Sequence, residues 1–278
     1  MDLWDSYDSS ATSQGFSIAD LHGREFTTNE VNSIAIWRKP FVRITHREGS
    51  DIEGDFAREQ LRVYLRSITS ILRKNGSLRL VDPFIEMSLS KLLQLQIAES
   101  FFDVPPWQFR TLSVPQTRDK LIVKPIGYPM LSDGRTVFTN LVNPVELSMP
   151  YPWLFQEPIL GGEDVTCVFI AGNLHWFKSR FKRSETSIDW RTEIQTDSES
   201  AWVSFEDPST ALLEKPVKDF MEKVGLKYGR LDFIQDESGR IWFLECNVNG
   251  EFGWLDNSQQ DLHREFFEAL LLPVNRIQ

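Results

Sequence analysis

Two strand-like runs near the C-terminus constrain this chain more than any other feature of its sequence. YGRLDFIQ (228–235) and RIWFLECN (240–247) are joined only by the tetrapeptide DESG, which is typical of a β-hairpin. A two-residue turn would place Asp232 directly opposite Glu245, whereas a four-residue loop would make the two acids diagonal neighbours. In both registers Asp232, Glu245 and Asn247 point to the same side, because successive strand residues alternate between faces.

This polar face of the hairpin has the composition of a magnesium site. Facing carboxylates repel each other across a sheet unless a cation lies between them. Two carboxylates and an amide oxygen make a hard oxygen donor set of the kind that Mg²⁺ prefers. The other face is predicted to be core, with Leu231, Phe233, Trp242, Leu244 and Cys246. The alternative is a solvated hairpin whose acids only face water, but the large apolar neighbours of both acids favour the metal site.

The same hairpin carries a resemblance to a known family. The order R-L-D-F-I, a turn, and then W-F-L-E-C-N-V-N-G-E-F-G-W-L resembles the C-terminal signature of ATP-grasp ligases. More narrowly, it is similar to that of the microviridin-type peptide maturases (graspetide synthetases), which ends in a similar E-x-N-x-N-G. The resemblance covers Ser33 to Leu255, and further elements fall in the expected order: IWRKP (36–40), KLLQLQIA (91–98), IVKP (122–125) and FQEPI (155–159).

The resemblance and the sequence pattern together predict an α+β protein with the ATP-grasp fold. We expect an N-terminal lobe at 1–80, a small ATP-grasp subdomain at 81–155 and a large subdomain with the metal site at 156–278. Relatives have an additional strand and helix before the IWRKP-like element, so the first lobe is expected to be shortened or completed by a partner subunit. The pattern predicts short strands in the first thirty residues, a strand at 31–37, antiparallel strands from Trp107 onward, and helices at 55–74, within 82–102, at 208–224 and near 259–271.

Two lysines are the candidate phosphate contacts of this fold. Lys124 alternates with apolar neighbours in LIVKPI, and Lys91 stands on a predicted helix. The resemblance implies that both bind ATP phosphates, although Lys91 also fits a solvated helix surface. The chain contains no GxxxxGK[ST] sequence, which argues against a P-loop. The segment GYPMLSDG (127–134) could instead cover the phosphates as a mobile loop.

The remaining nucleotide contacts are expected along the FQEPI segment. The resemblance implies that this segment reads adenine through backbone groups, with Gln156 and Glu157 alongside. Either Glu163 or Asp164 would hold the ribose, and the sequence does not choose between them. A polar turn at the two glycines that precede these acids is the alternative for both.

A basic stretch follows in the order expected for phosphate recognition. The resemblance places cations here that neutralise the γ-phosphate and an acyl-phosphate, and Arg suits planar, bidentate contacts. The candidates are Arg180 and Arg191, with Lys178 as a weaker choice. Lys182 and Arg183 are instead expected to lie on a solvated edge. Thr166 stands where many relatives have an arginine.

These residues predict acyl activation with ATP and Mg²⁺. A substrate carboxylate would attack the γ-phosphate, and an amine or hydroxyl would then displace phosphate from the acyl-phosphate, so no protein nucleophile is needed. The resemblance implies a ribosomal precursor peptide as substrate, with ω-ester or ω-amide crosslinks as product. The alternatives are a ligase that adds an amino acid to a protein tail or metabolite, and a non-catalytic module that binds nucleotide or peptide.

Composition excludes several other classes. The 278-residue chain has a formal net charge of −10, which argues against a nucleic-acid binder. Its start has no signal-peptide pattern, no apolar run is long enough for a membrane helix, and the four histidines have no zinc-ligand spacing. Cys167 and Cys246 do not suggest a disulfide framework. We therefore expect a cytoplasmic enzyme, and the sequence leaves a homodimer open.

Overall fold

The computed structural model describes most of the C-terminal two-thirds of the chain and parts of the remainder. The described residues are 7–12, 15–20, 22–27, 56, 59–60, 63–64, 66–71, 89–111, 115, 117, 119–127, 137, 139–144, 152–185, 188, 201–256 and 261–271. The chain forms two compact units, one of Met1–Glu86 with His263–Gln278 and one of Met87–Leu262. No helix in the described ranges is both long and apolar enough to cross a lipid bilayer.

The first unit contains a small sheet and helical segments. Strands β1 (Tyr7–Thr12), β2 (Gly15–Asp20) and β3 (Glu25–Thr27) form an antiparallel sheet in the order β1-β2-β3, which confirms the short strands expected there. All described residues between 56 and 71 are helical, in agreement with the predicted helix. Helix α4 (Leu262–Leu271) falls within the predicted C-terminal helix. The predicted strand at 31–37 and the IWRKP element lie outside the described residues.

The second unit begins with a four-stranded antiparallel sheet. Its order is β4-β7-β5-β6, formed by β4 (Trp107–Arg110), β5 (Leu121–Pro125), β6 (Asn140–Val142) and β7 (Trp153–Gln156). Alternation along these strands divides their residues between two faces. Leu121, Val123 and Phe155 pack together on one face. Lys124 and Gln156 therefore point to the other face, where both line a pocket.

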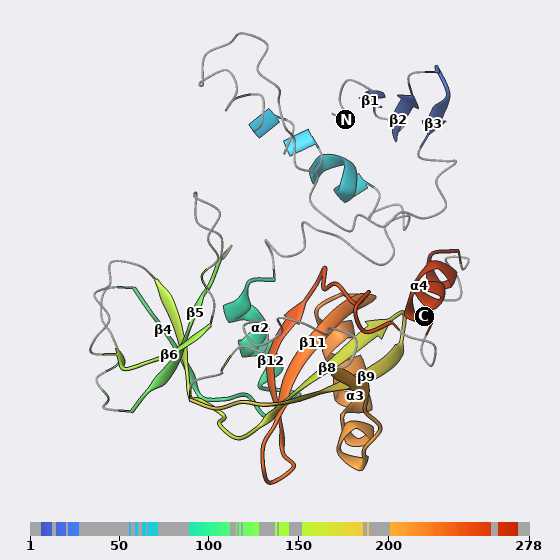
Figure 1. Ribbon diagram of the computed structural model, residues 1–278. Coiled ribbons are helices and arrows are strands. Elements are labelled where there is room, and N and C mark those ends of the chain that lie inside the picture. The colour runs from blue at the N-terminus through green and yellow to red at the C-terminus, as the bar shows by residue number, and fades with distance from the viewer. Residues whose placement is uncertain are drawn as a thin grey trace. The chain divides into compact units, whose positions relative to one another are not determined.

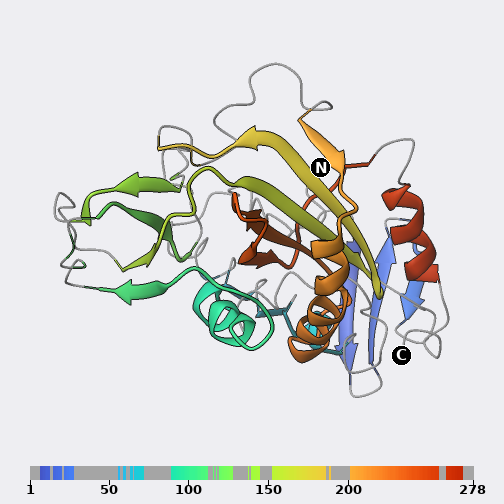
Figure 2. The same ribbon diagram turned by 90° about the horizontal axis from the view of Figure 1, so that it is seen from below.

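The same unit also contains a five-stranded antiparallel sheet (Figure 1). Its order is β10-β9-β8-β11-β12, formed by β8 (Glu163–Ile170), β9 (Asn173–Lys182), β10 (Trp202–Ser204), β11 (Tyr228–Gln235) and β12 (Ile241–Asn247). Figure 2 shows α2 (Lys91–Ala98) and α3 (Pro208–Lys223) on the same side of this sheet. Helix α3 ends within one residue of the predicted boundary and begins with Asp207 as its N-cap. Helix α2 lies within the predicted range 82–102 and begins only after its N-cap, Ser90.

Aromatic side chains fill the layer between this sheet and its helices. The Phe102 ring stacks on Phe243 at a centroid distance of 5.2 Å, and Phe220 and Phe233 each approach Phe243 within 5.6 Å. Burial of each such ring stabilises the fold by roughly 1.5–3 kcal/mol. This layer fixes one face of β11 and β12 against the helices and leaves the opposite face for polar groups.

The hairpin connection differs from both predicted turns, for a physical reason. The Asp236 N–H donates to the Arg240 carbonyl, so three residues form the loop, and Gly239 supplies the positive φ of +87° that such a loop requires. This loop alone would leave the acids out of register. A β-bulge between Phe243 and Glu245 adds one residue to β12 and brings Asp232 opposite Glu245, as predicted.

The same bulge corrects the prediction for the apolar face. It reverses the alternation along β12, so that Phe243 lies in the core. Trp242 and Leu244, both predicted to be core residues, lie instead on the side of Glu245 and are partly exposed. Leu244 lines the same pocket as Lys124.

Candidate functional site

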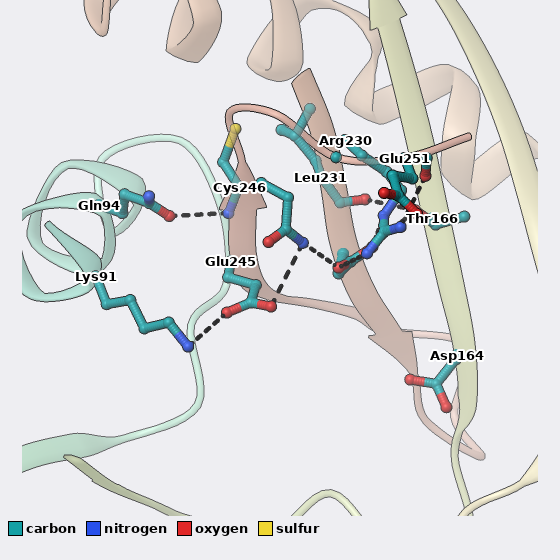
Figure 3. A network of polar contacts seen from close by, with 12 residues as sticks. Lys91, Gln94, Asp164, Thr166, Arg230, Leu231, Glu245, Cys246 and Glu251 are labelled. Atoms are coloured by element: carbon teal, nitrogen blue, oxygen red, sulfur yellow. Dashed lines mark hydrogen bonds and ion pairs between the residues drawn. The ribbon is translucent and has the colours of Figure 1, made fainter. Parts of the chain in front are cut away.

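The three predicted metal ligands lie together on the polar face of the hairpin (Figure 3). Asp232 and Glu245 are register partners on β11 and β12. The Asn247 Nδ2 donates to Asp232 Oδ2 at 2.7 Å and to Glu245 Oε1 at 3.4 Å. From the neighbouring strand, the Thr166 hydroxyl donates to Asp232 Oδ1 at 2.8 Å. The pairing of strands thus gathers two carboxylates, an amide and a hydroxyl in one place.

Arg230 neutralises Asp232 and was not identified from the sequence. Its Nε and Nη2 lie 3.1 Å from the two carboxylate oxygens of Asp232, and its Nη1 donates to the Glu251 carbonyl at 2.9 Å. The guanidinium also lies 5.6 Å from the centroid of the Trp254 ring. A signal existed, because Arg230 precedes Asp232 by two positions and a strand places such residues on one face.

Two lysines complete the positive side of the site. Lys91 Nζ lies 3.2 Å from Glu245 Oε2. Burial lowers the pKa of Lys124 to about 8, although the negative charge of Glu245 opposes this shift. Burial alone would raise the pKa of Glu245, but Lys91 and Lys124 outweigh it and hold that pKa at about 2. Both predicted phosphate contacts therefore lie beside the acids, and Glu245 is ionised at neutral pH.

A pocket between the two sheets of this unit adjoins these charges. It is lined by Pro105, Ile122, Lys124, Gln156, Glu157, Ile159, Arg183, Ile188, Ile234 and Leu244. Gln156 is only 2% exposed, and its Nε2 has no hydrogen-bond partner among the residues that the structure describes. An unpaired buried donor costs stability unless a ligand accepts from it. The Glu157 N–H, in contrast, donates to the Pro106 carbonyl at 2.9 Å.

Arg183 corrects another expectation. The sequence predicts a solvated edge for this residue, but its guanidinium makes a bidentate pair with the buried Asp164 and lines the pocket. The reason is an irregularity between β8 and β9, where Glu163 pairs with Lys182 and Val165 with Lys178. Three residues of β9 therefore face one residue of β8, which breaks the simple alternation.

The sheet separates the two candidate ribose contacts. Asp164 pairs with Ile234 on β11, and Ile234 lies two positions from Asp232, so Asp164 faces the site. Glu163 lies on the opposite face, where it forms an ion pair with Lys178 Nζ at 2.5 Å. Lys178 also donates to Gln235 Oε1 at 3.0 Å, so the structure does not bring Lys178 or Glu163 to the acids.

The remaining predicted cations are Arg180 and Arg191. Arg180 is exposed on β9, where its N–H donates to the Ala201 carbonyl of the segment leading into β10. Arg191 lies outside the described residues, and so does most of the 127–134 segment.

The donor set at the hairpin fits a magnesium ion. Within the described ranges, no three His, Cys, Asp or Glu side chains gather as a metal site, so a metal here depends on Asp232, Glu245 and Asn247. The Asn247 amide now turns its NH₂ group toward both acids. A rotation of the amide group would present its oxygen instead, since the two orientations have the same shape. Two carboxylates and an amide oxygen are ligands that Mg²⁺ accepts.

Comparison with solved structures identifies the fold. The chain is similar to a RiPP-associated ATP-grasp ligase of Chryseobacterium gregarium in complex with ADP and a leader and core peptide, with 21% identity, a TM-score of 0.79, and 96% of this chain and 84% of that chain covered. It is also similar to the macrocyclase MdnC of Microcystis aeruginosa bound with the precursor peptide MdnA, with 20% identity, a TM-score of 0.74, and 96% and 87% covered.

A third solved structure with the same fold is that of an enzyme with a different name. The D-alanine–D-alanine ligase of Bacillus anthracis aligns at 14% identity and a TM-score of 0.52, with 76% of this chain and 75% of that chain covered. No family model matches the sequence, and no curated protein does. The chain therefore has the predicted α+β ATP-grasp fold, and the structures establish this fold alone.

Proposed function

We propose that this chain is an ATP-dependent carboxylate ligase of the ADP-forming type. The observation that carries the proposal is the pair Asp232 and Glu245, held face to face beside Lys91, Lys124 and Arg230. Three positive side chains surround these two carboxylates. The site is therefore suited to bind a metal ion and a polyphosphate together. The adjoining pocket supplies apolar walls and an unpaired donor for a nucleotide base.

The site residues divide into three roles in this proposal. Asp232, Glu245 and Asn247 would hold Mg²⁺, which would offset the negative charge of the ATP phosphates during phosphoryl transfer. Lys91 and Lys124 would donate to phosphate oxygens. Because Lys124 is buried, its positive charge would attract phosphate more strongly there than in water. Gln156 would donate to the adenine ring, with Glu157 alongside, and Asp164 would accept from the ribose hydroxyls in competition with Arg183.

The reaction that suits these roles is activation of a carboxylate. A carboxylate oxygen of the substrate bonds to the γ-phosphorus of ATP while the bond to the leaving oxygen of ADP breaks. An amine or hydroxyl then attacks the acyl carbon, loses its proton and expels phosphate. Arg230 would stabilise the negative charge that develops in these steps, and Arg180 and Arg191 would contact the γ-phosphate. Lys178 pairs with Glu163 and Gln235 on the opposite face of the sheet and has no role in these steps.

We further propose that the substrate is a ribosomal precursor peptide and that the enzyme acts in the cytoplasm. Support comes from two structural relatives, one a RiPP-associated ligase in complex with a leader and core peptide and the other a macrocyclase bound with a precursor peptide. The products would be ω-ester or ω-amide crosslinks between Asp or Glu side chains and Thr, Ser or Lys. Ligation of an amino acid onto a protein tail or metabolite would use the same chemistry and is the second candidate, since a ligase of free amino acids shares the fold.

Intact mass spectrometry with ATP and Mg²⁺ tests this function. The probe is a synthetic small peptide rich in Thr and in Asp or Glu. A crosslink removes one water from the peptide, whereas ligation adds the mass of an amino acid. Asp232→Ala and Glu245→Ala should abolish ADP formation with the fold intact. Glu237→Ala, which removes a carboxylate from the loop of the same hairpin, is the matched control and should retain turnover.

The outcomes separate the candidate functions. Near-normal ADP formation in either site variant would remove the hairpin acids from the mechanism. Saturable ATP binding with no ADP release, for the peptide and for free amino acids, would indicate a non-catalytic binding module instead.

A further inference from the structure

Helix α2 meets the five-stranded sheet at its edge, beside the acids. Because β12 is the edge strand, the N–H groups on its outer side have no neighbouring strand to donate to. Two of them are satisfied by the segment that contains α2. The Cys246 N–H donates to Gln94 Oε1 at 2.9 Å, and the Phe243 N–H donates to the Asp103 carbonyl at 2.8 Å. These N–H groups are three residues apart and both point outward because of the bulge between them.

Gln94 is held at both ends of its amide. Its Oε1 accepts from Cys246, and its Nε2 donates to the Leu89 carbonyl at 3.3 Å. The side chain is only 6% exposed, so water competes little for these contacts. A neutral group with both a donor and an acceptor at this distance from the helix is what the position requires. The amide orientation follows from its two partners, because the reversed amide would place its oxygen against a carbonyl and its NH₂ against an N–H.

The place of Gln94 in the chain gives this contact a consequence for the site (Figure 3). Cys246 stands between Glu245 and Asn247, so the hydrogen bond fixes β12 between two of the proposed metal ligands. Gln94 also follows Lys91 by three residues, about one turn of α2, and Lys91 pairs with Glu245. One buried side chain therefore connects the helix that carries a phosphate cation with the strand that carries two metal ligands.

We propose that Gln94 is a positioning residue that sets the geometry of Glu245 and Asn247 toward the metal and of Lys91 toward Glu245. The inference rests on the proposed function, because it presumes that these residues hold the metal of an ATP site. Gln94 contacts neither metal nor nucleotide and acts only through the backbone of β12 and through α2. Loss of outer hydrogen bonds around metal ligands commonly weakens metal binding by 10- to 100-fold, and we expect about tenfold here because the contact is to the backbone.

The test measures binding of Mn²⁺, as the probe for the magnesium site, to the full chain at saturating ADP. The electron paramagnetic resonance signal of free Mn²⁺ reports the affinity without any need for turnover. Gln94→Met keeps the shape of the side chain and removes the acceptor, and it should bind Mn²⁺ about tenfold more weakly.

Leu95→Ala is the matched control. Leu95 is buried on the same helix and is apolar, so its loss loosens packing without removing a polar contact to β12. This variant should be less stable to urea than wild type and should keep wild-type Mn²⁺ affinity.

Each outcome bears on a different claim. Wild-type affinity in Gln94→Met would overturn the inference and leave the proposed function standing. Equal weakening in Gln94→Met and Leu95→Ala would also overturn it, because general loosening of α2 would then explain the loss. Absence of Mn²⁺ binding by the wild-type chain with ADP would instead contradict the proposed metal site itself.

Discussion

Substitution of Arg230 by methionine should destabilise the fold more than the loss of an ordinary surface ion pair. Arg230 makes two hydrogen bonds to Asp232 and one to the Glu251 carbonyl, and its side chain and that of Asp232 are only 16% and 24% exposed. The variant leaves the charge of Asp232 with the hydroxyl of Thr166 and the amide of Asn247 as its hydrogen-bond donors.

The expected magnitude follows from this incomplete compensation. Removing one partner of a fully buried ion pair costs about 3–5 kcal/mol. Because both side chains retain some contact with solvent and Asp232 keeps two neutral donors, the expected loss for Arg230→Met is about 2–3 kcal/mol. A second substitution, Asp232→Asn, removes the unpaired charge. The double variant should therefore regain about 1–2 kcal/mol relative to Arg230→Met.

Urea unfolding of the wild type, both single variants and the double variant measures these free energies as a double-mutant cycle. A loss below about 1 kcal/mol for Arg230→Met, the level of an exposed ion pair, would refute the reasoning. A double variant no more stable than Arg230→Met would refute it as well, because the penalty would then not arise from the charge of Asp232.

Three further predictions follow from the site. Because the pKa of Lys124 is about 8, its positive charge is lost as pH rises above that value. The affinity for ADP, measured by titration calorimetry, should therefore fall between pH 7 and 9.5. Lys124→Arg should remove this dependence, and a flat wild-type profile would argue against a phosphate contact. The pKa of Glu245 is lowered to about 2, so its stabilising contribution is complete above the unfolded-state pKa near 4.5 and is lost as pH falls from there toward 2. In urea unfolding, Glu245→Gln should therefore lose less stability than wild type between pH 5 and pH 3. Equal losses would contradict the lowered pKa. A Cβ at Gly250 would lie 2.6 Å from the Cβ of Arg230. Gly250→Ala should therefore cost about 1–3 kcal/mol of unfolding free energy and also weaken ADP binding. A neutral effect on both quantities would show that the loop after β12 does not support Arg230.

The strand alternation made part of the site predictable from the sequence. Asp232, Glu245 and Asn247 could be assigned to one face because the period of two holds for either hairpin register. The same rule would have identified Arg230. What no local pattern predicted was the three-residue loop with its compensating bulge, which preserves the pairing of the acids and moves Leu244 from the core to the pocket beside Lys124.

The rest of the site could not be predicted from the sequence, because it depends on contacts between segments that are paired only in the fold. Glu163 and Asp164 are adjacent in sequence and lie on opposite faces, so the choice between them required the register with β11. Arg183 reaches Asp164 only because β9 carries extra residues opposite β8, and composition suggested a solvated edge. The contact of Lys91 with Glu245 joins two distant segments, and only the family resemblance anticipated that both belong to one site.

The most direct test of the hairpin as the metal centre of an ATP site is calorimetric titration of ADP with and without Mg²⁺. The wild-type chain should bind one ADP, and Mg²⁺ should increase its affinity. The double variant Asp232→Asn/Glu245→Gln should still bind ADP through Lys91, Lys124 and the pocket, but Mg²⁺ should no longer increase its affinity. An equal effect of Mg²⁺ on both proteins would contradict the central claim, as would a wild-type chain whose ADP affinity does not depend on Mg²⁺.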